Sequence, residues 1–489
     1  MKFSIINNSF KYELEKVCRL FMPFEKFVFV TVDSDEDGVL TARYINGDLA
    51  ELYVSVKVNG QMAERRQSIA SSSEDYENTC ELVLCTLLHD CLHEITGYKP
   101  QWGILTAVRP AKLLSRLYSE MGKEQGMKYL KEKLLVSNSK AMLCDRCLSH
   151  EEKIISRSTP QSFSLYVAIP FCPSRCNYCS FVSHSIENAG KLIPEYLELL
   201  CKEIEYTAVL AKKANLKLQT IYIGGGTPTT LEAVGLEKLF SKIAECFDLR
   251  ALEEYTVEAG RPDTITYEKL QTIKNAGVTR ISINPQTMND EVLRSIERKH
   301  TAQQTIDAYK LAIDVGFQNI NMDLIAGLYG DTIESFSNTL DQILALSPQS
   351  ITVHSLSMKR SSTLTKANAF FGLEQGKVAD GMVKMAYERL TAANILPYYM
   401  YRQGKTVGNL ENVGYAKPGY EGLYNVYIMD ETHTILACGA SAVTKLRQPN
   451  GNNIERIFNY KYPYEYINEF GTMLDRKNKV SEFYELYSF

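Results

Sequence analysis

Three cysteines in the middle of the chain have the spacing of metal ligands. Cys172, Cys176 and Cys179 form a CxxxCxxC motif directly after a β-rich run. Three thiolates in one loop can bind three irons of a [4Fe–4S] cube, whereas a structural cluster usually takes four cysteines. The open fourth iron is typical of a metal site that does chemistry. A structural zinc, or a fully ligated cluster with a remote fourth cysteine, is the alternative.

A glycine-rich turn follows the next β-rich run. Its residues are Gly224, Gly225, Gly226, Thr227 and Pro228. Glycine lets the backbone approach a ligand closely, and proline stiffens the exit from the turn. A tight turn without any ligand explains such a run equally well.

Polar side chains also stand within later runs, at their ends or beyond them. One by one, such residues are more often helix caps or surface charges, but their spread over successive strand ends indicates one shared ligand site. An acidic group there suits a hydroxyl or an amino group of the ligand. The residues are Glu258, Gln286, Arg298, His300 (the end of an Arg-x-His sequence) and Asp323.

The middle of the chain alternates β-rich runs with amphipathic stretches such as Pro194–Ala208. This rhythm predicts parallel βαβ units. Six units indicate an α/β fold with a partial (β/α)6 TIM-like barrel, because a closed TIM barrel needs eight, and chemistry belongs at the carboxyl ends of its strands. The runs are Phe163–Ile169, Thr220–Ile223, Tyr255–Glu258, Arg280–Asn284, Asn319–Ile325 and Ser350–His354.

A chain of 489 residues is too long for one compact core, so we expect three domains. Residues 1–155, with a hairpin-like alternation at Asp48–Val58 and the sole tryptophan, Trp102, predict an N-terminal α/β accessory domain. Residues 156–372 hold the barrel. Residues 373–489, rich in Tyr and Gly, predict a small C-terminal domain that covers the substrate.

The net charge of −4 gives no broad attraction to nucleic acid or to anionic membrane. The N-terminus lacks the apolar segment of a secretory signal, and no apolar run approaches the roughly 20 residues that span a bilayer. We therefore expect a cytoplasmic protein without nucleic-acid binding or membrane insertion. In that compartment, closely spaced cysteines favour metal or redox chemistry over disulfides.

The stretch from Tyr166 to Cys179 (YVAIPFCPSRCNYC) resembles the signature loop of the radical S-adenosylmethionine (SAM) superfamily. Within it, the chain is similar to the oxygen-independent coproporphyrinogen III dehydrogenase (HemN-like) family. The likeness covers about residues 163 to 360. The sequences WGILTAVRP at 102–110, EAGRPDTI at 258–265 and NLENVGYAKPGYEGLYN at 409–425 extend it toward the HemZ branch.

The resemblance implies a [4Fe–4S] cluster on the three cysteines, with SAM chelated by the unique iron and cleaved to a 5′-deoxyadenosyl radical. A low-potential donor such as flavodoxin or ferredoxin would supply the electron. The glycine-rich turn would bind the methionine amino group, and Arg298 its carboxylate. The implied SAM contacts are Tyr166, Gly225, Gly226, Thr227, Glu258, Gln286, Arg298 and Asp323.

The family reaction is the oxidative decarboxylation of coproporphyrinogen III propionates to vinyls, which gives protoporphyrinogen IX for heme. Cationic anchors for the tetrapyrrole would be Arg175, Arg360 beside Lys359, and Arg402. Two departures bear on this chemistry: Ala168 replaces a frequent histidine, and Phe181 replaces a cysteine of the best-known dehydrogenases. A heme-binding chaperone of the HemW type, or another radical SAM reaction on a tetrapyrrole, is the alternative.

We expect the other cysteines and histidines to be structural residues outside the cluster site. Cys144 and Cys147, with His150 nearby, favour a pair of reduced thiols over half a zinc site. His89 and His93 stand four apart on an expected helix but lack the glutamate of a metalloprotease motif, so we expect core or surface histidines. The remaining cysteines lie mostly in apolar contexts and are expected to be small buried side chains: Cys18, Cys80, Cys85, Cys91, Cys201, Cys246 and Cys438.

Overall fold

The computed structural model describes residues 1–23, 25–32, 36–46, 49–70, 75–179, 183–357 and 373–487. Phe181, Lys359 and Arg360, which carry predictions above, lie outside the described residues, as does Asp48. The chain divides into two compact units. The first contains Met1–Arg146 with the later segments 373–380 and Arg402–Glu411, and the second contains the remaining described residues.

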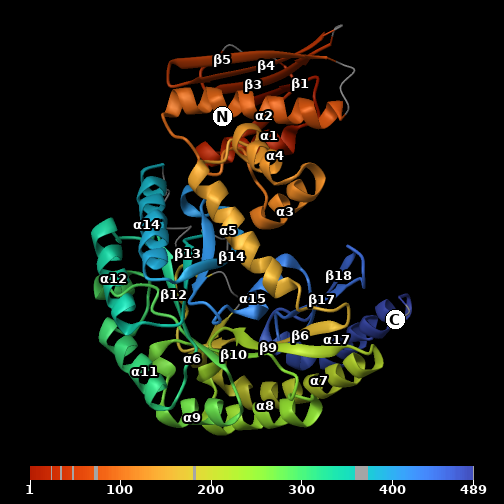
Figure 1. The fold of residues 1–489 in the computed structure, drawn as a ribbon, viewed down its shortest axis with the longest axis vertical. Helices are drawn as coiled ribbons and strands as arrows, with labels where there is room; N and C mark the ends of the chain where they lie inside the picture. Colours follow the sequence, from red (N-terminus) through yellow and green to blue (C-terminus); the bar gives the residue numbers. More distant parts are fainter. Residues whose placement is uncertain are drawn as a thin grey trace. The chain divides into compact units, whose positions relative to one another are not determined.

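The first unit is built on a five-stranded sheet in the order β2-β1-β3-β4-β5 (Figure 1). β1 pairs parallel with both of its neighbours, whereas β3, β4 and β5 form an antiparallel meander. The strands are β1 (Lys2–Ile6), β2 (Val28–Val30), β3 (Val39–Ile45), β4 (Leu49–Val58) and β5 (Gln61–Ala70).

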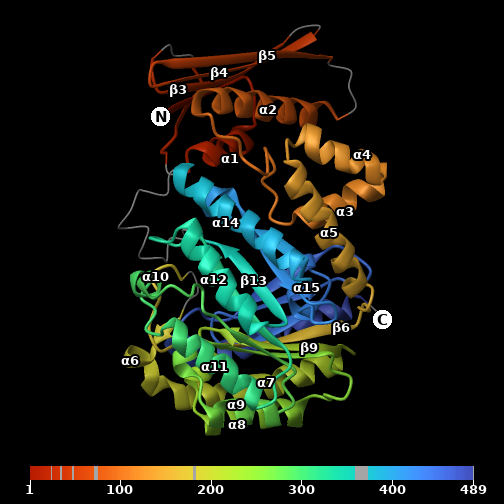
Figure 2. The ribbon, with the colours of Figure 1, turned by 60° about the vertical axis from the view of Figure 1, so that its left-hand side comes forward.

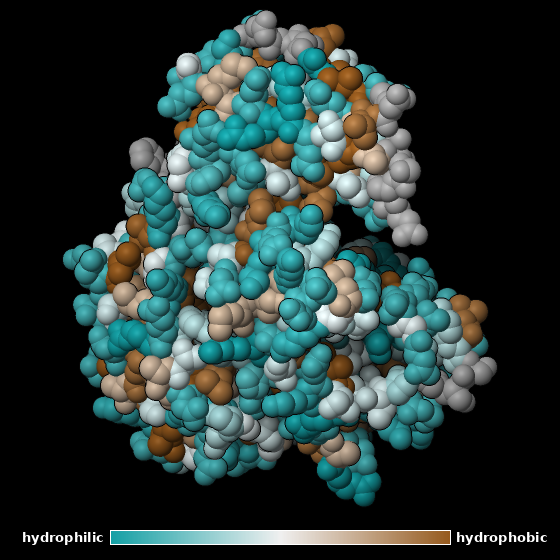
Figure 3. All heavy atoms as spheres, turned by 45° about the horizontal axis from the view of Figure 1, so that its top comes forward, coloured by the Kyte–Doolittle hydropathy of each residue, from teal (hydrophilic) through white to brown (hydrophobic). Residues whose placement is uncertain are grey.

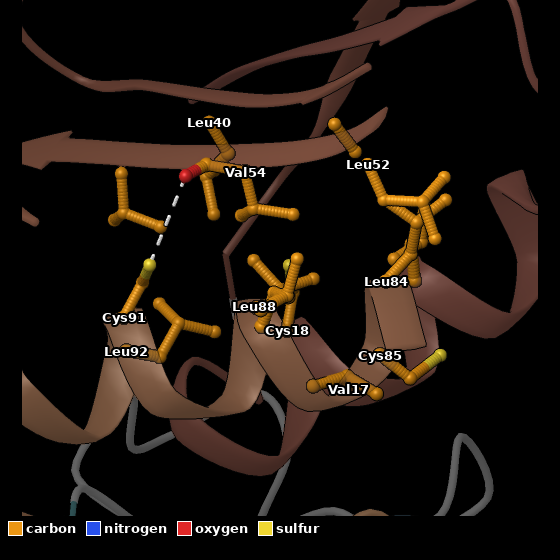
Figure 4. Close-up of a cluster of buried hydrophobic side chains, with 14 of the residues drawn as sticks. Val17, Cys18, Leu40, Leu52, Val54, Leu84, Cys85, Leu88, Cys91 and Leu92 are labelled. Atoms are coloured by element: carbon orange, nitrogen blue, oxygen red, sulfur yellow. Dashed lines mark hydrogen bonds between the residues drawn. The ribbon is translucent and has the colours of Figure 1, made fainter. Parts of the chain in front are cut away.

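Helices α1 (Lys11–Phe21) and α2 (Tyr76–Thr96) cover one face of this sheet. Figure 4 shows their apolar side chains, with Cys18 and Cys91, facing the strand residues Leu40, Leu52 and Val54. Burial raises the pKa of Cys85 to about 12, so its thiol stays protonated. Of the cysteines expected to be buried, Cys246 is partly exposed and the others are buried. The unit continues through α3 (Pro110–Met121), α4 (Lys123–Lys128), a π-helical turn (Tyr129–Lys133) and the first part of α5 (Asn138–Ile155).

The second unit holds six neighbouring parallel strands within an eleven-stranded sheet. Their order, β6-β9-β10-β11-β12-β13, follows the sequence, so the predicted (β/α)6 barrel class is confirmed. Helices lie along the outer face of these strands (Figures 1 and 2). The strands are β6 (Ser162–Ile169), β9 (Lys217–Gly225), β10 (Glu254–Gly260), β11 (Arg280–Ile283), β12 (Ile320–Ala326) and β13 (Ser350–Ser355). The helices are α7 (Ile193–Lys213), α8 (Ala233–Cys246), α9 (Tyr267–Asn275), α10 (Asp290–Ser295), α11 (Ala302–Asp314) and α12 (Ile333–Leu346).

Residues after the barrel add strands at both edges of the same sheet. β16 (Thr434–Cys438) pairs parallel with β6, and β17 (Val443–Arg447) and β18 (Ile454–Phe458) follow antiparallel. At the other edge, β15 (Glu411–Ala416) pairs antiparallel with β13, and β14 (Leu396–Arg402) lies beyond it. The division of the chain into three functional domains therefore stays a prediction.

The remaining short elements connect these parts. The helices are α6 (Ile186–Ala189), α14 (Leu373–Ala392), α15 (Leu423–Asp430), α16 (Pro463–Asn468), α17 (Phe470–Lys477) and α18 (Lys479–Glu485). Two-residue strands β7 (Phe171–Cys172) and β8 (His184–Ser185) pair with each other, and 3₁₀ turns span Gly190–Leu192, Pro228–Thr230, Pro262–Thr264 and Val407–Asn409.

A buried ion pair ties the C-terminal helices to the barrel. Glu203 on α7 is fully buried and lies 2.9 Å from the Lys477 ammonium. It also accepts hydrogen bonds from the Asn459 amide (2.7 Å) and the Tyr466 hydroxyl (2.5 Å). Breaking one partner of such a buried pair costs about 3–5 kcal/mol, so this network fixes α16 and α17 against α7.

None of the helices within the described residues is both long and apolar enough to cross a membrane. On the face drawn in Figure 3, hydrophilic residues predominate and hydrophobic ones are scattered among them.

Candidate functional site

The glycine-rich turn after β9 is bonded directly to the cysteine loop after β6. The Gly226 N–H donates to the Ile169 carbonyl (2.7 Å), and the Thr227 N–H donates to the Phe171 carbonyl (2.8 Å). A Cβ at Gly226 would lie 2.6 Å from the Phe171 oxygen and 3.0 Å from the Cys172 sulfur. Only glycine lets the two loops meet this closely, which explains the residue type at this position.

The cysteine sulfurs already have hydrogen-bond donors. The Thr227 hydroxyl donates to Cys172 Sγ (3.5 Å), and Arg261 Nη1 approaches Cys176 Sγ at 4.0 Å. The thiolate is the form of cysteine that binds metal. Cys172 and Cys176 are nearly buried, and Cys179 is partly exposed.

Within the described residues, no group of three or more Cys, His, Asp or Glu side chains is arranged to hold a metal ion. The chemistry of the donor set nevertheless fits an iron–sulfur cluster. Three thiols share one short loop, and Gly226 leaves a cradle beside Cys172 that a side chain would fill. That these three cysteines are the ligands stays a proposal.

Strand alternation points a layer of polar and aromatic side chains into the barrel at the level of the cysteine loop. Successive strand residues face opposite sides, and the apolar members of each strand, such as Leu165, Ile221 and Val257, face the helices. One inward residue comes from each strand or the position just after it: Tyr166, Tyr222, Glu258, Asn284, Asp323 and His354.

Hydrogen bonds between inward residues form a second layer below the first. The Thr220 hydroxyl donates to the Ser164 hydroxyl at 2.7 Å, and the Thr352 hydroxyl donates to Asn321 at 3.2 Å. The Asn321 amide also donates to Asp323 at 2.7 Å. TIM barrels usually fill this space with Val, Ile and Leu, so the interior here is unusually polar, and several of its side chains bond to one another.

An aromatic stack closes the floor of the site. The rings of Tyr222 and Tyr424 are 4.5 Å apart, and Tyr166 lies 6.2 Å from each of them. Tyr424 belongs to α15, whose first N–H groups, on Leu423 and Tyr424, donate to the Glu254 carboxylate at 2.7 and 3.1 Å. Glu254 therefore holds the helix that supplies the third ring.

Glu258 is a carboxyl group with an unusual protonation state. Burial raises its pKa to about 7, although the hydrogen bond that it accepts from the Tyr222 hydroxyl acts in the opposite direction. Gly224 leaves room beside it, because a Cβ there would lie 3.1 Å from the carboxylate. The group can therefore exchange a proton near neutral pH.

The pKa of Asp323 is shifted in the opposite direction from that of Glu258. Burial alone would raise its pKa, but the neighbouring His354 and Asn321 keep it below its ordinary value. His354 Nε2 lies 3.7 Å from the Asp323 carboxylate, and its Nδ1 lies 3.5 Å from the Tyr401 hydroxyl. The sequence analysis missed Tyr222 and His354, although the period-two pattern of their strands points both into the barrel.

Gln286 and Arg298 each present a buried polar atom without a hydrogen-bond partner among the described residues. Gln286 has a positive φ of 69° and is fixed through its backbone to Asp323 and Ile325 (both 2.9 Å), which leaves Oε1 unbonded. Arg298 donates through Nε and Nη2 to the Tyr178 hydroxyl (3.1 and 2.8 Å), while Nη1 stays unbonded. Buried groups of this kind call for a ligand or ordered water.

Four of the eight sequence-predicted SAM contacts lie at the carboxyl end of a barrel strand or in the loop that follows it: Gly225, Gly226, Thr227 and Gln286. Tyr166, Glu258 and Asp323 lie within β6, β10 and β12, and Arg298 lies after α10. Their roles stay proposals. Of the predicted substrate anchors, Arg175 is exposed in the cysteine loop, and Arg360 is outside the described residues. Arg402 is only 3% exposed and donates to the carbonyls of Leu105 and Asn409 in the first unit, which does not favour a role as a substrate anchor.

Comparisons with known proteins agree with this geometry. Residues 166–343 match the family model of the radical SAM superfamily. The chain is 38% identical over 410 residues to the oxygen-independent coproporphyrinogen-III oxidase-like protein HemZ of Bacillus subtilis, covering 83% of this chain and 81% of that one. It is 31% identical over 322 residues to the heme chaperone HemW of Lactococcus lactis, covering 65% and 79% of the two chains.

Among solved structures, the coproporphyrinogen III oxidase HemN of Escherichia coli, a radical SAM enzyme, shares the fold. The TM-score is 0.51 at 22% identity, over 68% of this chain and 73% of that one. The cofactors of this fold and family are a [4Fe–4S] cluster and SAM. The chain belongs to the radical SAM superfamily and, within it, to the family of HemZ, the oxygen-independent coproporphyrinogen-III oxidase-like proteins.

Proposed function

We propose that this protein is a radical SAM enzyme that converts coproporphyrinogen III to protoporphyrinogen IX without oxygen. Each reacting propionate would lose a hydrogen atom from its β-carbon, carbon dioxide and one electron, which leaves a vinyl group. The electron passes to an external one-electron acceptor. The observation that carries the proposal is the likeness to HemZ over more than four fifths of this chain, well beyond the barrel.

When bound, the cluster and SAM supply the abstraction of the hydrogen atom. The chain's own task is to hold them and to orient the propionate carbon. Cys172, Cys176 and Cys179 would bind the cluster. Arg298 Nη1 would meet the SAM carboxylate, and Glu258, Gln286 and Asp323 would meet its other polar groups.

The floor of the site supports a reaction that must exclude water. Tyr424 of α15 stacks with Tyr166 and Tyr222 inside the barrel, and a substrate would enter from the loops at the carboxyl ends of the strands. The exposed Arg175 lies in the cysteine loop itself. A substrate with four propionates would meet this guanidinium close to the cluster.

A heme chaperone is the second candidate. Heme chaperones of the HemW type are 29–38% identical to this chain over 40–65% of its length. Such a protein would keep the cluster but bind heme rather than decarboxylate a porphyrinogen. The third candidate function is a different radical SAM reaction on a tetrapyrrole at the same site.

One anoxic assay separates these candidates. The reconstituted full-length protein is incubated with SAM, a low-potential reductant such as flavodoxin, an electron acceptor and coproporphyrinogen III, and a parallel sample receives heme and a heme-free acceptor protein in place of the porphyrinogen. We expect protoporphyrinogen IX and 5′-deoxyadenosine. Transfer of heme without SAM cleavage would support the chaperone instead, and SAM cleavage with a different tetrapyrrole product would support the third candidate.

Two cysteine variants provide matched controls for the assay. Cys176→Ala should abolish the brown colour, SAM cleavage and product formation together, because one of the three proposed ligands is lost. Cys246→Ala removes a partly exposed thiol on α8 and should preserve all three. Colour and activity that persist in Cys176→Ala would show that the ligand assignment is wrong.

A further inference from the structure

Arg261 is a buried cation beside the cysteine loop, and the proposed reaction gives its charge no role. It follows β10 directly and is only 3% exposed. Its Nη1 donates to the carbonyl and the hydroxyl of Ser174 (3.1 and 2.9 Å), a residue between Cys172 and Cys176. The same nitrogen lies 4.0 Å from Cys176 Sγ.

The opposite edge of this guanidinium is fixed by a carboxylate. Nε and Nη2 donate to the two oxygens of Asp263 at 3.0 and 2.8 Å. Bidentate pairs of this kind set orientation as well as charge. Because Asp263 and Cys176 meet different edges of the guanidinium, the positive charge lies nearer to the sulfur than the negative charge does.

Burial of the Arg261 guanidinium costs free energy unless the cation has a further partner. A buried guanidinium loses its hydration, and its pairing with Asp263 offsets only part of that cost. A thiolate on a neighbouring cluster would supply the remaining interaction. The hydrogen bonds to Ser174 alone could be made by a neutral side chain, so the charge itself needs an explanation.

We propose that Arg261 raises the reduction potential of the iron–sulfur cluster through Cys176. One-electron reduction makes the cluster more negative, and a fixed cation with an N–H directed at a ligand sulfur stabilises that state. Charge and hydrogen bonds to the sulfurs are among the factors that set cluster potentials. Arg261 is thus a positioning residue for the loop and an electrostatic one for the cluster, and the inference rests on Cys176 being a ligand.

The test is a redox titration of the reconstituted full-length protein, followed by the electron paramagnetic resonance signal of the reduced cluster. Arg261→Gln removes the charge but keeps a side-chain N–H group. We expect its midpoint potential to fall by at least about 59 mV, which corresponds to a tenfold change in the equilibrium constant of a one-electron reduction.

The chain offers a matched control at the other end of the same strand. Arg250 precedes β10, is 90% exposed and pairs with Asp248 at 2.6 Å, also two residues away in sequence. Arg250→Gln makes the same change in net charge but should leave the midpoint potential where it is in the unchanged protein. Equal potentials for Arg261→Gln and Arg250→Gln would overturn the proposal.

Arg261→Lys separates charge from loop structure. It keeps the cation, so its potential should lie closer to that of the unchanged protein than to that of Arg261→Gln. If both Arg261 variants lose iron, while the molecules that retain a cluster keep the potential of the unchanged protein, Arg261 only stabilises the structure of the loop and the proposal fails. A cluster signal that persists in Cys176→Ala would instead show that the cysteine assignment is wrong, and the proposal would fail with it.

Discussion

Arg298 donates hydrogen bonds from two of its nitrogens to the cysteine loop, and its third nitrogen is available to a ligand. Its guanidinium is oriented by the Tyr178 hydroxyl, between Cys176 and Cys179, and its Nη1 has no partner among the described residues. An arginine that binds a carboxylate is expected to be oriented by one protein group while another of its N–H groups stays available to the ligand.

Replacing Arg298 by Ala should weaken SAM binding by about 10- to 100-fold, since hydrogen bonds to charged groups contribute about 1.5–3 kcal/mol. The affinity can be measured by equilibrium dialysis on the reconstituted protein, with iron content as a check on the cluster. Arg294→Ala is the control, because Arg294 is exposed on the preceding helix α10. Unchanged affinity in Arg298→Ala would remove it from the site.

Glu258 gives the stability of the protein a pH dependence. Its pKa rises from an ordinary 4.5 to about 7 in the folded state, so the folded protein binds a proton more tightly than the unfolded chain. The stabilisation is complete below the unfolded pKa and is lost as pH rises through about 7. The full difference corresponds to about 3 kcal/mol.

Relative to Glu258→Gln, the unchanged protein should therefore lose up to about 3 kcal/mol of unfolding free energy between about pH 5 and about pH 8. Gln keeps an oxygen that can accept the Tyr222 hydrogen bond, which makes it the matched variant. Urea unfolding of the SAM-free protein at both pH values measures the effect. Parallel pH profiles for the two proteins would contradict a raised pKa.

At the scale of secondary-structure elements, the contact between two loops decides whether the site can form. Gly226 packs against backbone oxygens of the cysteine loop, and backbone atoms cannot move aside as a flexible side chain can. We expect Gly226→Ala to displace the loop, to lower iron retention and to cost about 1–3 kcal/mol, as overpacking does.

Gly235→Ala is the control for that prediction. Gly235 lies in α8, where a Cβ would meet Leu197 at an ordinary 3.5 Å. Ala is the better helix former by up to about 1 kcal/mol, so this variant should be neutral or more stable. Iron analysis and denaturant unfolding test both variants, and full iron content in Gly226→Ala would show that the loop tolerates the added methyl group.

The barrel strands could be predicted from the sequence because each is a short apolar run between polar turns. The run expected at Phe163–Ile169, for example, is β6 at Ser162–Ile169. The neighbour of β6 on its open edge, β16, could not be predicted. Its pairing joins residues far apart in the sequence, and one short apolar segment does not specify its partner.

The site was partly predictable for a related reason. Glu258 and Asp323 lie within β10 and β12, but a carboxylate in a mostly apolar run stands out in the sequence. Tyr222 and His354 also lie within strands, and because such rings occur on either face of a sheet, their role depends on which way each strand faces. Arg261 depends on a contact with Ser174 across the barrel mouth, which only the folded loops create.

At the scale of the whole molecule, the first compact unit is completed by residues from late in the chain. Trp102 Nε1 donates to the Glu411 carboxylate at 2.7 Å, and the Lys140 ammonium lies 2.8 Å from the same group. Glu411 is fully buried, and although burial would raise its pKa, Lys140 and Trp102 keep it below the ordinary value. Glu411 thus binds both the indole N–H and the Lys140 ammonium, which also lies 3.5 Å from the Asp380 carboxylate.

A fragment of residues 1–146 would lack that carboxylate, and we expect it to lose the native environment of Trp102. The side chain is only 1% exposed in the full chain, and it is the sole tryptophan, so its fluorescence reports this site alone. The fragment should show red-shifted emission and a broad unfolding transition, because Lys140 would be left without its buried partner. Full-length Glu411→Gln should shift the emission less, since an amide oxygen can still accept the indole hydrogen bond. A fragment with the emission of the full chain and a sharp transition would show that the first unit folds without Arg402–Glu411.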